Sequence, residues 1–119
     1  MKKFYTYPKC GTCRKANTWL KDHNIEVQAI DITLAPPSKE ELKEILKDSG
    51  LSIKKLFNTS GVKYRELGLK EVIPTKSEDE LLELLASDGK LIKRPLLTDG
   101  KHATVGFNEE VYEEIWLQK

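Results

Sequence analysis

Two cysteines, Cys10 and Cys13, place the strongest constraint on how this chain folds. They are its only cysteines, and they lie between a short run rich in aromatic residues and an amphipathic stretch. A Cys-x-x-Cys pair at the turn from a strand into a helix is typical of a redox-active dithiol. The helix N-terminus favours the thiolate of the first cysteine, and the second cysteine lies within disulfide reach. The pair therefore predicts a strand, a turn and a helix at the start of the fold.

The composition is that of an ordinary globular domain, with 39% hydrophobic residues, 33% charged residues and a formal net charge of +1. No lysine run forms a basic stripe, so direct nucleic-acid binding has little electrostatic support. No apolar segment is long enough for a membrane span or a signal peptide. We expect a single domain over residues 1–119 in the cytoplasm, where a Cys-x-x-Cys pair is more often catalytic or metal-binding than structural.

Hydrophobic periodicity predicts a βαβ unit in the first third of the chain. Strands are expected at residues 3–7 and 26–32, and a helix from Cys13 to about Asn24 lies between them. Strand, helix and strand within about thirty residues are expected to form a parallel pair with a right-handed crossover.

Helix-capping residues and helix-breaking residues divide the rest of the chain into further elements. Capping-box patterns open two helices, one at Ser38 with Glu41 and one at Ser77 with Glu80. A short helix is expected at residues 53–57, and residues 59–71 are expected to be irregular. The last third is predicted to contain a strand at residues 90–98 that Pro95 interrupts, a two-residue Asp99-Gly100 hairpin turn, a strand at residues 103–107 and a final helix capped by Asn108.

A βαβ half joined to a ββα half makes a four-stranded mixed sheet with helices on its faces. The expected fold class is therefore α/β, a thioredoxin-like fold with a helical insert at about residues 38–87. This fold places its dithiol after the first strand, where the sequence has Cys10 and Cys13.

Two segments resemble the arsenate reductase-like (ArsC/Spx) family. Residues 7–16, YPKCGTCRKA, resemble its active-site segment, and residues 93–97, KRPLL, followed by VGFNE at 105–109, resemble its second signature. The resemblance covers nearly the whole chain and implies a thioredoxin-like fold and thiol redox chemistry. The family contains glutaredoxin-coupled arsenate reductases, redox-sensing regulators of the Spx branch that bind RNA polymerase, and stand-alone oxidoreductase-like relatives.

The arsenate reductases of this family bind their oxyanion with several arginines. Arg94 matches one of them, whereas residues 57–61 offer Asn58 in place of an arginine. These reductases usually lack a cysteine at the position of Cys13, whereas the Spx-type regulators share the Cys-x-x-Cys pair. The residues alone therefore do not decide which branch of the family this chain resembles most. The arsenate reductases, the Spx-type regulators and the stand-alone relatives all remain open.

The order of the two cysteines predicts their roles. Cys10 precedes the helix, is expected to be the more exposed and is the candidate nucleophile. Cys13 lies in the first helical turn and is the candidate resolving thiol, which attacks a mixed disulfide on Cys10. Two alternatives are a zinc half-site shared between two chains and a pair of inert core cysteines.

Five further residues are candidates at the same site. Arg94 is predicted to act as an anion clamp facing Cys10, with a surface arginine as the alternative. The resemblance implies a cis peptide bond before Pro95, which leaves a neighbouring backbone group free to pair with a thiol partner. Substrate contacts are expected from Pro95, Gly11, Thr12 and Arg14, although Thr12 also fits plain turn chemistry.

The sequence therefore predicts a thiol–disulfide oxidoreductase that needs no metal or organic cofactor. Its expected partners are a thiol reductant (glutathione, glutaredoxin or a thioredoxin-like protein) and a disulfide or oxyanion substrate, with no nucleic acid and no membrane. The alternatives are a non-catalytic Spx-like redox switch that binds a protein partner through the insert helices, and a glutaredoxin-coupled arsenate reductase.

Overall fold

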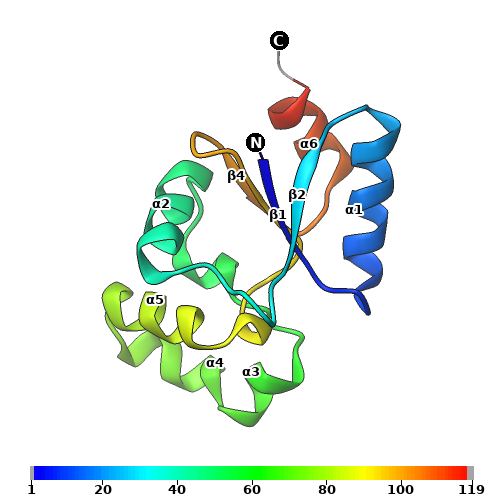
Figure 1. Cartoon of the computed structure of the whole chain (residues 1–119). Helices are drawn as coiled ribbons and strands as arrows, with labels where there is room; N and C mark the ends of the chain where they lie inside the picture. Colours follow the sequence, from blue (N-terminus) through cyan, green and yellow to red (C-terminus); the bar gives the residue numbers. More distant parts are fainter. Residues whose placement is uncertain (1, 118–119) are drawn as a thin grey trace.

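A computed structural model describes residues 2–117, in which a four-stranded sheet lies between two groups of helices (Figure 1). The strands are β1 (Lys2–Thr6), β2 (Val27–Asp31), β3 (Leu96–Thr98) and β4 (Ala103–Val105). The α-helices are α1 (Gly11–Asp22), α2 (Lys39–Ser49), α3 (Val62–Glu66), α4 (Leu69–Val72), α5 (Glu78–Ser87) and α6 (Glu109–Trp116). Three 3₁₀ helices are η1 (Ile53–Leu56), η2 (Ile73–Thr75) and η3 (Gly89–Leu91).

The sheet has the order β2-β1-β3-β4. Strands β1 and β2 are parallel, whereas β3 is antiparallel to both β1 and β4. The βαβ and ββα halves therefore join into a four-stranded mixed sheet, which confirms the predicted α/β, thioredoxin-like fold. Helices α2 to α5 form the predicted insert between the two halves (Figure 1).

Strand β1 separates two hydrophobic cores because its side chains alternate between the faces of the sheet. Phe4 points to one face and packs with Trp19 of α1 and Trp116 of α6. Tyr5 points to the other face and packs with the buried side chains of α2 and α5. Both are almost fully buried, so β1 is packed on both faces close to the point where the loop toward Cys10 begins.

The caps confirm the predicted helix starts. The Ser38 side chain accepts a hydrogen bond from the Glu41 backbone N–H, and Ser77 with Glu80 forms a reciprocal capping box. The Asn108 side chain caps α6 by accepting from the backbone N–H of Val111, 3.2 Å away.

Three local predictions were wrong. Residues 59–71 are not irregular: they hold α3 and α4, which are too short for a hydrophobic period to be read from the sequence. The strand expected at residues 90–98 covers only Leu96–Thr98, because η3 and the segment around Pro95 come first.

The hairpin loop was also predicted too short. Thr98 pairs with Ala103, so the loop holds four residues and not two. The Asp99 carboxylate accepts hydrogen bonds from the backbone N–H groups of Lys101 and His102, at 2.8 and 2.7 Å. An aspartate that bonds to the backbone following it stabilises this longer turn, so Asp99-Gly100 marked the place of the turn but not its length.

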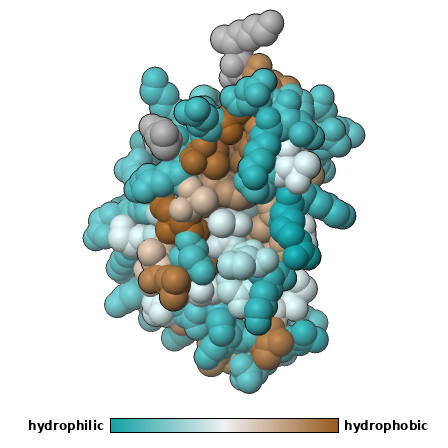
Figure 2. Space-filling view, turned by 45° about the vertical axis from the view of Figure 1, so that its right-hand side comes forward, coloured by the Kyte–Doolittle hydropathy of each residue, from teal (hydrophilic) through white to brown (hydrophobic). Residues whose placement is uncertain are grey.

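Hydrophilic side chains cover most of the face drawn in Figure 2, and hydrophobic ones gather in its upper middle. The exposed large apolar side chains include Leu34 and Val62. Among the described residues, no helix is long and apolar enough to cross a membrane.

Candidate active site

The Cys-x-x-Cys pair lies where the loop after β1 enters α1. The backbone N–H of Cys10 donates to the carbonyl of Tyr7 at 3.1 Å, which closes the loop. Cys10 is the N-cap of α1, and its Sγ accepts a hydrogen bond from the backbone N–H of Cys13 at 3.3 Å. The sulfur thus takes the position in which a capping oxygen usually satisfies a free N–H group of the first turn. A thiolate in this position is favoured by the helix dipole.

The two thiols have opposite environments. Both cysteines are free, Cys10 is partly exposed and Cys13 is buried, with 1% of its surface exposed. Burial acts to raise the pKa of Cys10, but the hydrogen bonds from Cys13 and the charge of Arg94 outweigh it and lower that pKa. Burial, followed by the hydrogen bond with Cys10, raises the pKa of Cys13 to about 11. The pair therefore consists of an accessible acidic thiol and a buried thiol that keeps its proton.

Arg94 is held beside the thiols by the segment before β3. The Arg94–Pro95 peptide bond is cis, as the resemblance implied. The Arg94 guanidinium lies over the Tyr7 ring, 4.7 Å from its centroid, which is a cation–π contact. Its Nη1 is buried and has no hydrogen-bond partner among the described residues. A buried guanidinium nitrogen without a partner is costly in water-poor surroundings unless a thiolate or bound anion accepts from it.

Cys10 opens into a cleft of about 720 Å³, called here the Cys10 cleft. It lies between the start of α1, the start of α3 and the turn after β4. A Cβ at Gly61, on its edge, would lie 2.6 Å from the Asn58 side-chain nitrogen, so a larger residue there would displace the Asn58 amide. The residues lining the cleft are Cys10, Thr12, Asn58, Ser60, Gly61, Val62, Lys93, Arg94, Val105, Gly106, Phe107 and Asn108.

The structure brings some predicted site residues together and separates others. Thr12 and Arg94 line the Cys10 cleft with Cys10. Gly11 is exposed as the first residue of α1, and Pro95 is buried. Arg14 does not line this cleft: it lies at a separate cavity beside Cys13.

Sequence reasoning missed Tyr7 as a partner of Arg94, although an aromatic residue three positions before the first cysteine was visible. It also missed Thr6, which lines a cavity together with Cys13 and acts to lower the pKa of that thiol. No pattern in the sequence marks Thr6, because its importance depends on where β1 ends.

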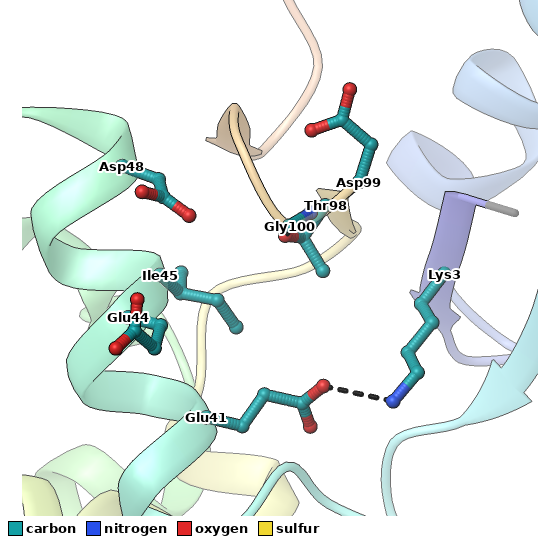
Figure 3. A pocket seen from close by; sticks show the side chains of 8 residues that line it. All are labelled: Lys3, Glu41, Glu44, Ile45, Asp48, Thr98, Asp99 and Gly100. Atoms are coloured by element: carbon teal, nitrogen blue, oxygen red, sulfur yellow. Dashed lines mark hydrogen bonds and ion pairs between the residues drawn. The ribbon is translucent and has the colours of Figure 1, made fainter.

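A different cleft, called here the α2 cleft, lies between α2 and the β3–β4 loop (Figure 3). Within it the Lys3 ammonium lies 3.0 Å from Glu41 Oε2, and the Tyr5 hydroxyl donates to Glu41 Oε1 at 2.5 Å. Glu41 is thus paired with a cation, and no thiol lines this cleft. In the described range 2–117, no three His, Cys, Asp or Glu side chains gather as a metal site requires. The Cys10 cleft therefore remains the candidate for chemistry.

The ArsC family model matches residues 5–115, which is most of the chain. The chain belongs to the ArsC family. It is 65% identical over 113 residues to the uncharacterized Bacillus subtilis protein YusI, covering 95% of this chain and 96% of YusI. It is 38% identical to the regulatory protein MgsR of Bacillus subtilis, covering 88% of this chain and 82% of MgsR.

Solved structures of the family share the fold. A possible arsenate reductase from Streptococcus mutans superposes with a TM-score of 0.87 and 46% identity, covering 95% of this chain and 98% of the other. The ArsC family thus includes close relatives of this chain named as regulators and as possible reductases.

Arg94→Gln is expected to raise the pKa of Cys10, because the variant loses a positive charge that favours the thiolate. The measurement is thiolate absorbance in the ultraviolet against pH, carried out on Cys13→Ala proteins so that one thiol titrates. Arg65→Gln is the control, since Arg65 is exposed and donates to the Ser60 carbonyl at 3.3 Å. An unchanged titration in Arg94→Gln would contradict the role of its charge.

Proposed function

We propose that this protein is a thiol–disulfide oxidoreductase that uses Cys10 as nucleophile and Cys13 as resolving thiol. The observation that supports it most is the contrast between the two sulfurs. Cys10 is accessible, with a lowered pKa, at the mouth of a cleft, and Cys13 is buried beside it with a raised pKa. Functional thiols are expected in such partly exposed, electropositive surroundings.

The reaction has two exchange steps. The Cys10 thiolate attacks a substrate disulfide, an S–S bond forms between Cys10 and one substrate sulfur, and the other sulfur leaves as a thiolate that takes up a proton. Cys13 then loses its proton and attacks Cys10 Sγ, which releases the second substrate thiol. The substrate disulfide is reduced to two thiols and the protein is oxidised to a Cys10–Cys13 disulfide. A thiol reductant such as glutathione, glutaredoxin or a thioredoxin-like protein reverses the sequence and resets the pair.

Arg94 would stabilise the thiolate in both directions, since its charge acts to lower the pKa of Cys10 and its buried Nη1 has no partner among the described residues. Lys93 adds a second cation to the cleft lining, and Asn58 provides a neutral amide. This lining suits a neutral or weakly anionic sulfur partner better than a multiply charged oxyanion, for which several guanidinium groups would be needed. We therefore place arsenate second to disulfides as a substrate.

A regulatory role is the second candidate, and the 38% identity to a regulatory protein supports it. In that case the same dithiol would change the affinity for a protein partner and would not turn over a substrate. Oxidation and partner binding would then be linked by a coupling free energy.

One assay tests the proposal. Reduced protein is incubated with hydroxyethyl disulfide, glutathione and a glutathione-recycling system, and arsenate replaces the disulfide in parallel samples. We expect turnover of the disulfide, together with a Cys10–Cys13 disulfide detected by mass spectrometry as the loss of two hydrogens. Failure to turn over any disulfide, while the pair still oxidises reversibly, would favour the regulatory role.

A further inference from the structure

A separate cavity reaches the buried thiol. It has a volume of about 200 Å³, and it shares no lining residue with the Cys10 cleft. We call it the Cys13 cavity. Its lining comes from β1, the loop after it, α1 and β2. The residues are Phe4, Thr6, Tyr7, Pro8, Cys13, Arg14, Asn17 and Ala29.

The resolving step needs this access because Cys13 holds its proton tightly. Burial raises the pKa of Cys13, so this thiol keeps its proton at pH 7. Cys13 is 1% exposed, so the proton has no direct path to bulk solvent. Once Cys10 is occupied by a mixed disulfide, it also lacks the free thiolate that could accept this proton. A group other than Cys10 must therefore assist Cys13.

Thr6 is placed to give this assistance. It is the last residue of β1, its side chain is partly exposed, and it lines the Cys13 cavity together with Cys13. The Thr6 side chain and the backbone of Tyr7, which line the same cavity as Cys13, act to lower the pKa of that thiol. A hydroxyl can accept the thiol proton and donate another to water, and it can then donate to the thiolate that remains.

The other ionisable groups around Cys13 do not replace this hydroxyl. Cys10 Sγ, with Arg94 beside it, faces Cys13 from the helix N-terminus. The Tyr112 hydroxyl approaches from α6, but it donates to the Gly106 carbonyl at 3.3 Å, and burial raises its pKa, so it keeps its proton. Arg14, at the rim of the cavity, is a cation and accepts no proton.

On the basis of the proposed oxidoreductase function, we propose that Thr6 and the Cys13 cavity form a proton route dedicated to the resolving thiol. The Cys13 proton passes through the Thr6 hydroxyl to water that enters the cavity, which is large enough to hold it. The Cys13 thiolate then attacks Cys10 Sγ, the Cys10–partner S–S bond breaks as the Cys10–Cys13 bond forms, and the departing thiolate takes up a proton from solvent. The mixed disulfide is the oxidant in this step, because one S–S bond replaces another, and no external oxidant is needed.

Stopped-flow reaction with Ellman's disulfide separates the two steps. The first release of coloured thiolate reports attack by Cys10, and the second reports attack by Cys13. Thr6→Val, which removes the hydroxyl but keeps the shape, is expected to slow the second release about tenfold, the effect of losing a hydrogen bond to a charged group. It is also expected to shift the pH profile of the second release to higher pH. The first release keeps its wild-type rate.

Further variants separate this route from a structural effect. Thr6→Ser, which restores a hydroxyl, is expected to recover most of the second rate, and Thr18→Val on the exposed face of α1 is the matched control. Ala29→Leu narrows the cavity from β2 and is expected to slow the second release without removing Thr6.

A wild-type second release in Thr6→Val, or equal slowing of both releases, overturns the proposal. A wild-type second release in Ala29→Leu overturns the part played by the cavity. A wild-type protein with no second release would instead reject the proposed function itself.

Discussion

Replacing Cys10 with serine is expected to reduce disulfide turnover by more than about 10³-fold, whereas replacing Cys13 is expected to stop the cycle one step later. A serine hydroxyl is a poor nucleophile at neutral pH and has no base beside it here, and loss of a nucleophile typically removes most of the rate. Cys10 is the sulfur that opens into the cleft, and its pKa is lowered by Cys13 and Arg94. Cys13, which is buried, has no comparable access to a substrate on that side.

The Cys13 variant provides the more specific result. Cys13→Ser and Cys13→Ala are expected to form a stable mixed disulfide with the substrate thiol on Cys10, because no second sulfur is available to displace it. Intact-mass spectrometry detects the adduct, and a reducing agent removes it. The absence of an adduct in both Cys13 variants, with turnover kept in Cys10→Ser, would contradict the assigned order of attack.

These variants also separate the two candidate functions. A redox regulator with a partner needs both sulfurs to oxidise but does not need turnover, so neither cysteine variant would change a rate. An oxidoreductase loses its rate with Cys10 and accumulates the adduct without Cys13. Circular dichroism on both variants checks that the fold is retained, because Cys13 is packed in the interior.

The order of strands and helices could be predicted because it depends on local signals. Capping residues at Ser38, Ser77 and Asn108 and the alternation in β1 each act within a few residues. The region before β3 could not be predicted from such signals. Its apolar residues resemble a strand, but Gly89 packs against the backbone of Ile32 more than fifty residues earlier in the chain.

The site was predictable in its chemistry and less so in its geometry. Cys10, Cys13 and Arg94 have side chains whose reactivity suggests a role wherever they stand, and the structure places them together. Arg14 was expected at the same cleft as a positive charge close to Cys10 in sequence. Two residues along α1, from Thr12 to Arg14, turn the side chain about 200° around the helix axis, so Thr12 lines the Cys10 cleft and Arg14 lines the Cys13 cavity. Thr6 has an unremarkable side chain, and the role proposed for it depends on the position at which β1 ends.

Gly89→Ala is expected to destabilise the fold by about 3 kcal/mol or more, the second large effect. A Cβ at this position would lie 1.8 Å from the Ile32 carbonyl oxygen and 2.7 Å from its carbonyl carbon. Both are backbone atoms directly after β2, so no side-chain rotation relieves the overlap. The 3₁₀ helix η3 would have to move away from the sheet. Thermal unfolding followed by circular dichroism is expected to show a melting temperature lower by roughly 10 °C or more.

The same displacement is expected to reach the active site, because η3 leads directly into Lys93, Arg94 and Pro95. If Arg94 moves away from Cys10, the Cys10 thiolate loses a stabilising charge, and its pKa is expected to rise even in the folded fraction. Gly11→Ala is the control for stability, since a Cβ there meets nothing within 4 Å and Gly11 lies in a helix. Equal melting temperatures for Gly89→Ala and the wild type would show that η3 does not press on β2, and the position of Arg94 would then need another explanation.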